Sequence, residues 1–167
     1  MASESARATS AAEARFRIDH PNSAPRAVKV IALDPASERV VKEIARAAWS
    51  RAGFLTAASF NAPRRDESFS GWLSDLAGRA TDLVGEIAAA DLVVVVAAAG
   101  ENAQAASVIA EAASLKGVMT TALIVGSAGK PDAALARTLT ELRPYAAMIV
   151  IASEDEYIAD MLAALRA

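Results

Sequence analysis

Residues 91–125 read DLVVVVAAAGENAQAASVIAEAASLKGVMTTALIV, and this stretch decides the fold. Its run at 92–96 is apolar and mostly β-branched, which is typical of a parallel strand that is covered on both faces. Apolar residues recur at helical spacing over 105–115, and Gly117 stands where a left-handed residue ends a helix. A second strand-forming run follows at 120–125. The pattern therefore predicts a strand, a tight loop, a helix and a second strand.

The loop at 100–104 is the best candidate site in the sequence. In such units phosphate groups bind where the carboxyl end of a strand meets the amino end of a helix, and glycines let backbone N–H groups come close. This loop reads GENAQ, so it keeps one glycine and carries an acidic residue where an anion would sit. Two interpretations stay open, a site for a ligand less anionic than a polyphosphate and an ordinary solvated helix start. The candidate residues are Gly100, Glu101, Asn102 and Gln104.

The remaining patterns predict an alternation of strands and helices. We expect strands at 28–33, 54–60, 92–96, 120–125 and 148–152. We expect helices from Pro35 to near Gly53, over 73–89, over 105–115, from after the loop at 126–131 to Pro144, and after residue 153. Right-handed crossovers fold this order into a three-layer α/β domain with a doubly wound, mainly parallel five-stranded sheet, which is a Rossmann-like fold. Residues 26–167 form this single domain, and residues 1–25 are expected to be a disordered tail.

Polar residues after the other strands supply further ligand-binding candidates. Asp34 has the chemistry of a phospho-acceptor, a metal ligand or a ribose contact, but its place before Pro35 favours a structural role as a helix N-cap. Ser127 lies in the turn GSAGKP, which could bind an anion but lacks the spacing of a P-loop, so a plain surface turn is favoured. These candidates are Asp34, Ser37, Ser127 and Ser153. Ser153 also opens a predicted capping box that Glu156 completes.

Composition excludes several classes of function. The 167 residues include one histidine and no cysteine. Without a Ser-His-Asp set, a Cys-His pair or a metal-ligand cluster, we expect no catalytic residues, no metal and no cofactor. A net charge of −3 gives no general attraction to nucleic acid or to an anionic membrane. No apolar run approaches the roughly 20 residues of a membrane span and no secretory signal is visible, so we expect a cytoplasmic protein.

Residues 26–167 as a whole resemble the nucleotide-binding half of the FtsZ and tubulin family of GTPases. The run VKVIALDPASERVVKEI (28–44) resembles the opening strand, phosphate loop and first helix of that family, and FLTAASFNA (54–62) resembles its next strand. Residues 86–125 are similar to the segment that carries the family's GGGTGTG-like signature. LTELRPYAAMIVIASED (139–155) resembles the closing helix and strand.

The sequence departs from the family at the loops that hold the nucleotide. The first loop is glycine-rich in the family, whereas residues 34–38 read DPASE, and the signature keeps only Gly100. Proline has no N–H to donate, and the carboxylates of Asp34, Glu38 and Glu101 would repel a triphosphate. The family continues into a central helix, a catalytic acidic loop and a second domain where this sequence stops. The resemblance therefore implies a degenerate nucleotide pocket, and GTPase activity is not expected.

Three functions follow from these patterns. The first is a non-catalytic FtsZ-like domain that acts by self-association, as a homo-oligomer, or by binding a protein partner. The second is a small-molecule-binding module that uses the loop at 100–104. The third is a phosphosugar-binding domain like that of sugar isomerases, which is ranked last because Ala97, Ala98 and Ala99 supply no hydroxyl groups for a phosphate.

Overall fold

A computed structural model describes residues 24–60, 73–152 and 156–167 of the chain. The strands are β1 (Val28–Ala32), β2 (Ala52–Thr56), β3 (Ser74–Asp75), β4 (Leu92–Ala98), β5 (Met119–Val125) and β6 (Met148–Ile151). The helices are α2 (Pro35–Ile44), α3 (Leu83–Ala88), α4 (Ala105–Leu115), α5 (Asp132–Leu142) and α6 (Glu156–Ala164). The strands form one sheet in the order β3-β2-β1-β4-β5-β6, and only the β2–β3 pair is antiparallel. This mostly parallel α/β arrangement is Rossmann-like, as the sequence predicts.

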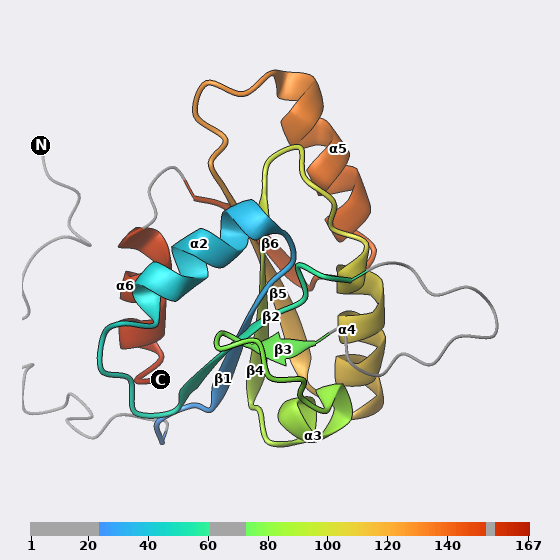
Figure 1. Cartoon of the computed structure of the whole chain (residues 1–167). Coiled ribbons are helices and arrows are strands. Elements are labelled where there is room, and N and C mark those ends of the chain that lie inside the picture. The colour runs from blue at the N-terminus through green and yellow to red at the C-terminus, as the bar shows by residue number, and fades with distance from the viewer. Residues whose placement is uncertain (1–23, 61–72, 153–155) are drawn as a thin grey trace, which may run out of the picture.

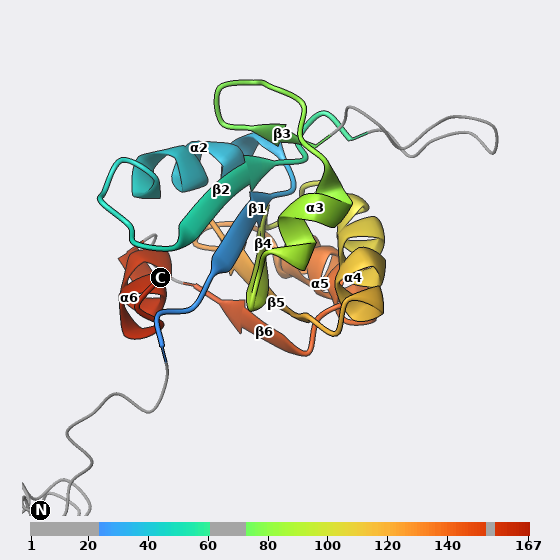
Figure 2. The same ribbon diagram turned by 90° about the horizontal axis from the view of Figure 1, so that it is seen from below.

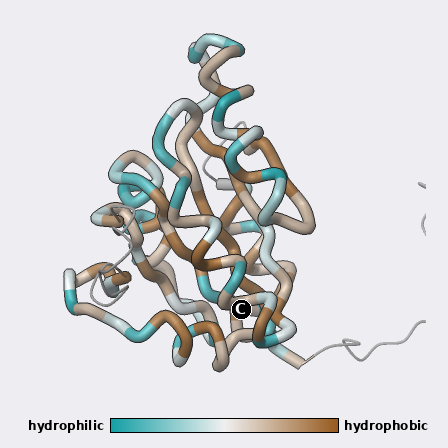
Figure 3. Tube along the Cα trace, turned by 90° about the vertical axis from the view of Figure 1, so that its right-hand side faces the viewer, coloured by the Kyte–Doolittle hydropathy of each residue, from teal (hydrophilic) through white to brown (hydrophobic). Residues whose placement is uncertain are grey.

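Helices cover both faces of the sheet (Figures 1 and 2). Helices α2 and α6 lie together on one face, and α3, α4 and α5 lie on the other. Alternate residues of each strand supply the two cores: Val30 and Val94 face α2 and α6, whereas Ile31 and Val95 face the other three helices. Figure 3 shows the hydrophobic residues concentrated along the interior of the trace.

Strand β4 is the centre of the sheet and is buried along its whole length. It pairs with β1 through Leu92–Val96 and with β5 through all seven residues. The prediction from residues 91–125 is confirmed, because β4, α4 and β5 follow in the expected order and Gly117 has a φ of 69°. A strand buried on both faces has no polar face, which explains its unbroken apolar run.

Helix α2 begins as predicted but ends sooner. Asp34 is its N-cap and Pro35 its first residue, whereas its last residue is Ile44 and not a residue near Gly53. The Ile44 carbonyl, which a longer helix would have used, accepts the Ala47 N–H at 3.2 Å and the indole N–H of Trp49 at 2.9 Å. The early end lets β2 start at Ala52, two residues before the predicted strand.

Strand β2 also ends before the predicted boundary at residue 60. Its last residue is Thr56, whose hydroxyl accepts a hydrogen bond from the Ala58 N–H at 3.1 Å. The Phe60 N–H then donates to the Ala57 carbonyl at 2.8 Å. These two bonds turn the chain out of the sheet and place Ala58 and Phe60 above the strand ends.

The prediction of five strands and of one helix over 73–89 is wrong, because β3 occupies the start of that range. The Asp75 carboxylate accepts hydrogen bonds from the Ala77 and Arg79 N–H groups and pairs with the Arg79 side chain. Gly78 has a φ of 83°, so the chain turns there and does not continue as a helix. Helix α3 starts only at Leu83, with Asp82 as its N-cap.

Some predictions fall outside the described residues. These are the tail, of which residues 1–23 are not described, and Ser153 with the start of its predicted capping box. Among the helices in the described ranges, none is both long and apolar enough to cross a membrane.

Candidate functional site

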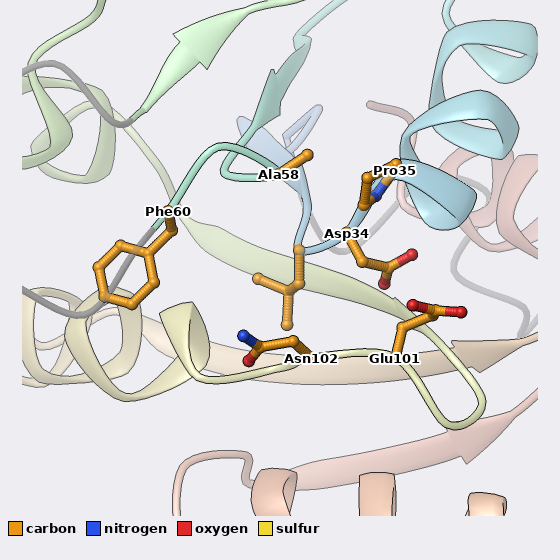
Figure 4. Close-up of a pocket in the computed structure, with 7 residues that line it drawn as sticks. Asp34, Pro35, Ala58, Phe60, Glu101 and Asn102 are labelled. Atoms are coloured by element: carbon orange, nitrogen blue, oxygen red, sulfur yellow. The ribbon is translucent and has the colours of Figure 1, made fainter.

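A small pocket lies where the strand order reverses, at the carboxyl ends of β1 and β4. From this point the chain continues outward through β2 on one side and β5 on the other, and ligands of open α/β sheets bind at such reversals. The pocket has a volume of about 70 Å³. Figure 4 shows the carboxylates of Asp34 and Glu101 facing each other across it. The lining residues are Leu33, Asp34, Pro35, Ala58, Phe60, Glu101 and Asn102.

Asp34 uses both carboxylate oxygens for bonds within the protein. Oδ1 accepts the N–H groups of Ala36 at 2.9 Å and Ser37 at 2.8 Å, which are the free donors at the start of α2. Oδ2 accepts the Ala98 N–H at 2.9 Å and lies 2.9 Å from the Ser37 hydroxyl. The side chain is buried, and Asp34 is 2% exposed. Asp34 therefore caps α2, as predicted, and also joins it to the end of β4, which the sequence did not indicate.

Ser37 is also buried and lies in the same network. Its hydroxyl lies 3.0 Å from the Asp34 carbonyl and accepts the Asp34 N–H at 3.2 Å, so the two residues form a reciprocal capping box. Pro35 supplies no N–H, and the N–H of Glu38 donates to the Asp34 carbonyl as in a regular helix. The first turn of α2 thus offers no free N–H group at its start.

The loop after β4 is packed against α5. Gly100 has a φ of 87°, and its N–H donates to the Thr138 hydroxyl at 2.8 Å. A Cβ built on Gly100 would lie 3.0 Å from the Cβ of Ala134. Thr138 is fully buried, and its hydroxyl also lies 3.3 Å from the Ala134 carbonyl. Gly100 is therefore needed for its backbone conformation and for close contact with α5, two needs that do not involve a ligand.

Two further side chains bind the backbone of the loop that leads into α4. The Asn102 side-chain oxygen accepts the Gln104 N–H at 2.9 Å. The Glu141 carboxylate, which comes from α5, accepts the Ala103 N–H at 3.0 Å. The other oxygen of Glu141 lies 3.6 Å from Arg137. A carboxylate of the protein thus lies just before the start of α4, close to the place where phosphates bind in related units.

The predicted candidates divide into four groups by position. Asp34, Glu101 and Asn102 line the pocket, while Ser37 and Gly100 lie directly behind it in the networks described above. Gln104 is exposed at the N-cap of α4 and forms no side-chain cap bond. Ser127 is half-buried in the turn after β5, where its carbonyl accepts the Lys130 N–H at 3.1 Å. Ser153 lies outside the described residues.

Sequence reasoning missed Thr138 and Glu141, because both lie inside a helix predicted only from its leucines. Thr138 is the one visible signal, since it is a polar residue between Leu135 and Leu139 on a face that the pattern predicts to be buried. Glu141 shows no such signal, because an acidic residue paired with Arg137 four positions earlier is common on exposed helix surfaces.

The charge around the pocket is negative. Asp34 and Glu101 line it, and among the described residues no lysine or arginine does so. Glu38, in the first turn of α2, is bound by the Lys42 ammonium and by the Thr56 hydroxyl at 2.9 Å. The hydrogen bond from Lys42 is the main cause that lowers the pKa of Glu38, and it outweighs the opposing effect of burial. This carboxylate therefore stays charged at neutral pH.

In the described ranges, no three acidic, histidine or cysteine side chains gather into a set that could hold a metal ion. Asp34 binds N–H groups at the start of α2, and Asn102 and Glu141 bind N–H groups in the loop before α4. The arrangement can stabilise the start of α2 and the loop before α4. An incoming anion would meet carboxylates at the place where a phosphate site has N–H donors. A scan of protein-family models and a search of curated proteins found no match to this chain.

Proposed function

We propose that this chain is a non-catalytic FtsZ-like α/β domain that acts by self-association or by binding a protein partner, and that its nucleotide pocket is degenerate. One observation carries the proposal: the protein's own side chains bind backbone donors at the start of α2 and in the loop that leads into α4. Asp34 binds the N–H groups of Ala36 and Ser37 in α2, whereas Asn102 and Glu141 bind those of Gln104 and Ala103, which precede α4.

Electrostatics and size support the same conclusion. A nucleoside triphosphate would have to displace the Asp34 carboxylate and leave a buried charge without its partners, which costs several kcal/mol. The pocket volume of about 70 Å³ is also well below the roughly 300 to 1,000 Å³ of typical ligand pockets. Neither cost is offset by a cation, because the described lining residues include no lysine or arginine.

The FtsZ-like part of the proposal rests on the sequence resemblance and is consistent with the sheet order. The order of a doubly wound nucleotide-binding sheet is kept from β3 to β6. Gly100 also keeps the positive φ that a tight loop after β4 requires. A scaffold of this kind, in which a buried carboxylate binds the donors at the start of α2, is suited to protein contacts more than to phosphate chemistry.

Calorimetric titration of the full chain with GTP and Mg²⁺, together with a phosphate-release assay, tests this function. We expect no saturable heat up to about 1 mM nucleotide, the limit that corresponds to about 4 kcal/mol of binding free energy. We also expect no phosphate release above that of the buffer. Saturable Mg²⁺-dependent binding with turnover would contradict the proposal.

A small-molecule function is the second candidate, and the position of the pocket favours it. The exposed side chains of Glu101 and Asn102 line a hollow at the strand reversal, next to the ring of Phe60. Carboxylate and amide groups beside an aromatic ring would suit a small cationic or amide-bearing group. A thermal-shift screen with amino acids, nucleosides and sugar phosphates tests this. The small-molecule function would be supported by a compound whose stabilisation is lost in Glu101→Gln. The same stabilisation should persist in the control Glu111→Gln, which changes the exposed surface of α4. If no compound stabilised the protein, that would count against this function.

The phosphosugar function has less support. The Ser37 hydroxyl, which would be a phosphate donor near the pocket, is buried against Asp34. In the same screen, stabilisation by sugar phosphates alone would favour this third function over the first two.

A further inference from the structure

Helix α5 is held to the rest of the protein less firmly than α4, although both have 11 residues. Five residues of α4 are buried, whereas only Thr138 and Leu142 are buried in α5. Both lie in the second half of α5, so residues 132–137 include no buried side chain. Figure 1 shows α5 standing beyond α4, with its amino-terminal end at the top of the view. Segments with few buried contacts open at a lower free energy than the whole protein.

The two ends of α5 differ in how they are fixed. Its N-cap residue is Pro131, which makes no side-chain hydrogen bond to the helix, whereas α2 and α3 are capped by aspartates. In the loop before it, Gly126 and Gly129 have φ values of 63° and 73°, with open space around both. At the other end Leu142 is fully buried. The helix is therefore anchored at its carboxyl end and loosely held at its amino end.

The inner face of α5 holds the loop that carries the exposed side chains of the candidate pocket. The Thr138 hydroxyl accepts the Gly100 N–H at 2.8 Å, and the Glu141 carboxylate accepts the Ala103 N–H at 3.0 Å. Residues 101–102, which lie between these two anchors in the sequence, line the pocket. Because α5 binds the loop at both ends, the position of the loop follows that of the helix.

We propose that α5 is a strap that opens and closes over the loop at 100–103, turning about its carboxyl end near Leu142. The structure has the strap closed, with both anchors made. Opening frees the N–H groups of Gly100 and Ala103, and it releases Glu101 and Asn102 from their fixed place in the pocket. This device goes beyond the proposed function, because it does not depend on what the domain binds.

The strap connects two surfaces of the molecule. Its outer face includes the exposed residues Ala133, Ala136 and Arg137, whereas its inner face holds the pocket loop. A molecule that binds one position of a two-state element more tightly shifts the population toward that position. A partner that binds the outer face of α5 in one position therefore changes the pocket without touching it.

Native-state hydrogen exchange of the full chain, followed by NMR, tests the strap. The amides at 136–140 in α5 and at 109–113 in α4 form a matched comparison, because they hold equivalent places in two helices of equal length. We expect protection factors at least about 100-fold lower in α5 than in α4, since α5 opens without global unfolding. Those of the Gly100 and Ala103 N–H groups are expected within about threefold of the α5 value. The Ala98 N–H, which Asp34 binds, is expected to follow α4.

Ala136→Gly tests whether the loop and the helix open together. Ala136 is exposed in the middle of α5, so this variant lowers helix propensity and removes no buried contact. We expect the protection factors of 136–140, Gly100 and Ala103 to fall together by about fivefold, and that of Ala98 to stay unchanged. The matched control is Ala163→Gly at an exposed position of α6, on the other face of the sheet. It is expected to leave the amides of α5 and of the loop unchanged.

Two results would overturn the inference. The first is equal protection of the α5 and α4 amides in the wild type, because the helix would then open only when the whole protein unfolds. The second is a loss of protection in α5 of Ala136→Gly that Gly100 and Ala103 do not share. Circular dichroism shows whether the variants are folded, and the wild-type comparison decides the matter if one is not. None of these results bears on GTP binding, so this inference and the proposed function fail independently.

Discussion

The carboxylate of Asp34 accepts a hydrogen bond from the backbone N–H of Ala98 at 2.9 Å, across 64 positions of the sequence. The same carboxylate caps α2, so one buried side chain joins the first helix to the end of the central strand. In a nucleotide-binding fold this space between the two strand ends receives phosphate. Here the Asp34 side chain occupies it, and the proposed loss of nucleotide binding rests on this relationship.

Asp34→Ala is expected to destabilise the protein by about 3 kcal/mol, because it removes a helix cap and leaves the buried Ala98 N–H without an acceptor. Urea unfolding followed by circular dichroism measures the change. The control is Asp82→Ala, which removes the exposed cap of α3 and should cost about 1 kcal/mol. Equal losses in the two variants would show that the contact with β4 contributes nothing.

Thr138→Val should cost about 1 to 3 kcal/mol, because the Gly100 N–H would lose its partner beside a buried position. Thr140→Val on the same helix is the matched control, since the Thr140 hydroxyl is exposed and bonds to the Ala136 carbonyl within α5. We expect the control to stay within about 0.5 kcal/mol of the wild type in urea unfolding. If both variants matched the wild type, α5 would not hold the loop after β4.

Gly100→Ala is expected to be more destabilising than Gly126→Ala. Both glycines have a positive φ, so both variants carry the backbone cost of about 1 kcal/mol or more. Only Gly100 has a neighbour in the way, because its new Cβ would lie 3.0 Å from that of Ala134, whereas Gly126 has open space. Thermal unfolding of the two variants gives the difference, expected to be at least about 1 kcal/mol. A smaller difference would mean that α5 moves aside without cost.

Glu38 should make stability depend on pH at the acidic end. Its pKa in the folded protein is lowered from the ordinary value of 4.5, mainly by the hydrogen bond from Lys42. The stabilisation is therefore complete above the unfolded pKa and is lost as pH falls through the lowered folded pKa. The wild type should be more stable than Glu38→Gln at pH 7, and the difference should shrink below pH 4.5. Urea unfolding of both proteins at a series of pH values measures this difference in stability. A difference that does not vary with pH would refute the role of Glu38.

Much of the fold could be predicted from local patterns. The buried run of β4, the capping by Asp34 and the left-handed Gly117 are set by neighbours in sequence, and all three are confirmed. The boundaries that failed depend on side chains that bond to backbone. The Trp49 indole bonds to the carbonyl of the last residue of α2, and the Asp75 carboxylate binds the turn after β3 where a helix was predicted.

The sequence could predict the residues of the candidate site that follow the strands, but not those that α5 contributes. Glu101 and Asn102 follow a strand that the sequence identifies, so their place in the pocket was accessible to pattern reasoning. Glu141 comes from α5, 38 positions after the N–H group of Ala103 that it binds. Contacts at such separation depend on how the helices pack, and helical spacing alone does not fix that.

The most direct test of the central claim is an amide NMR titration of the full chain with GTP and Mg²⁺. It follows the N–H signals of Ala36, Ser37, Ala98 and Ala103, which the structure shows to be bound by Asp34 and Glu141. We predict that these four signals stay in place up to about 1 mM nucleotide. Saturating shifts of the Ala36, Ser37 and Ala103 signals would show that phosphate reaches these donors, and would contradict the account.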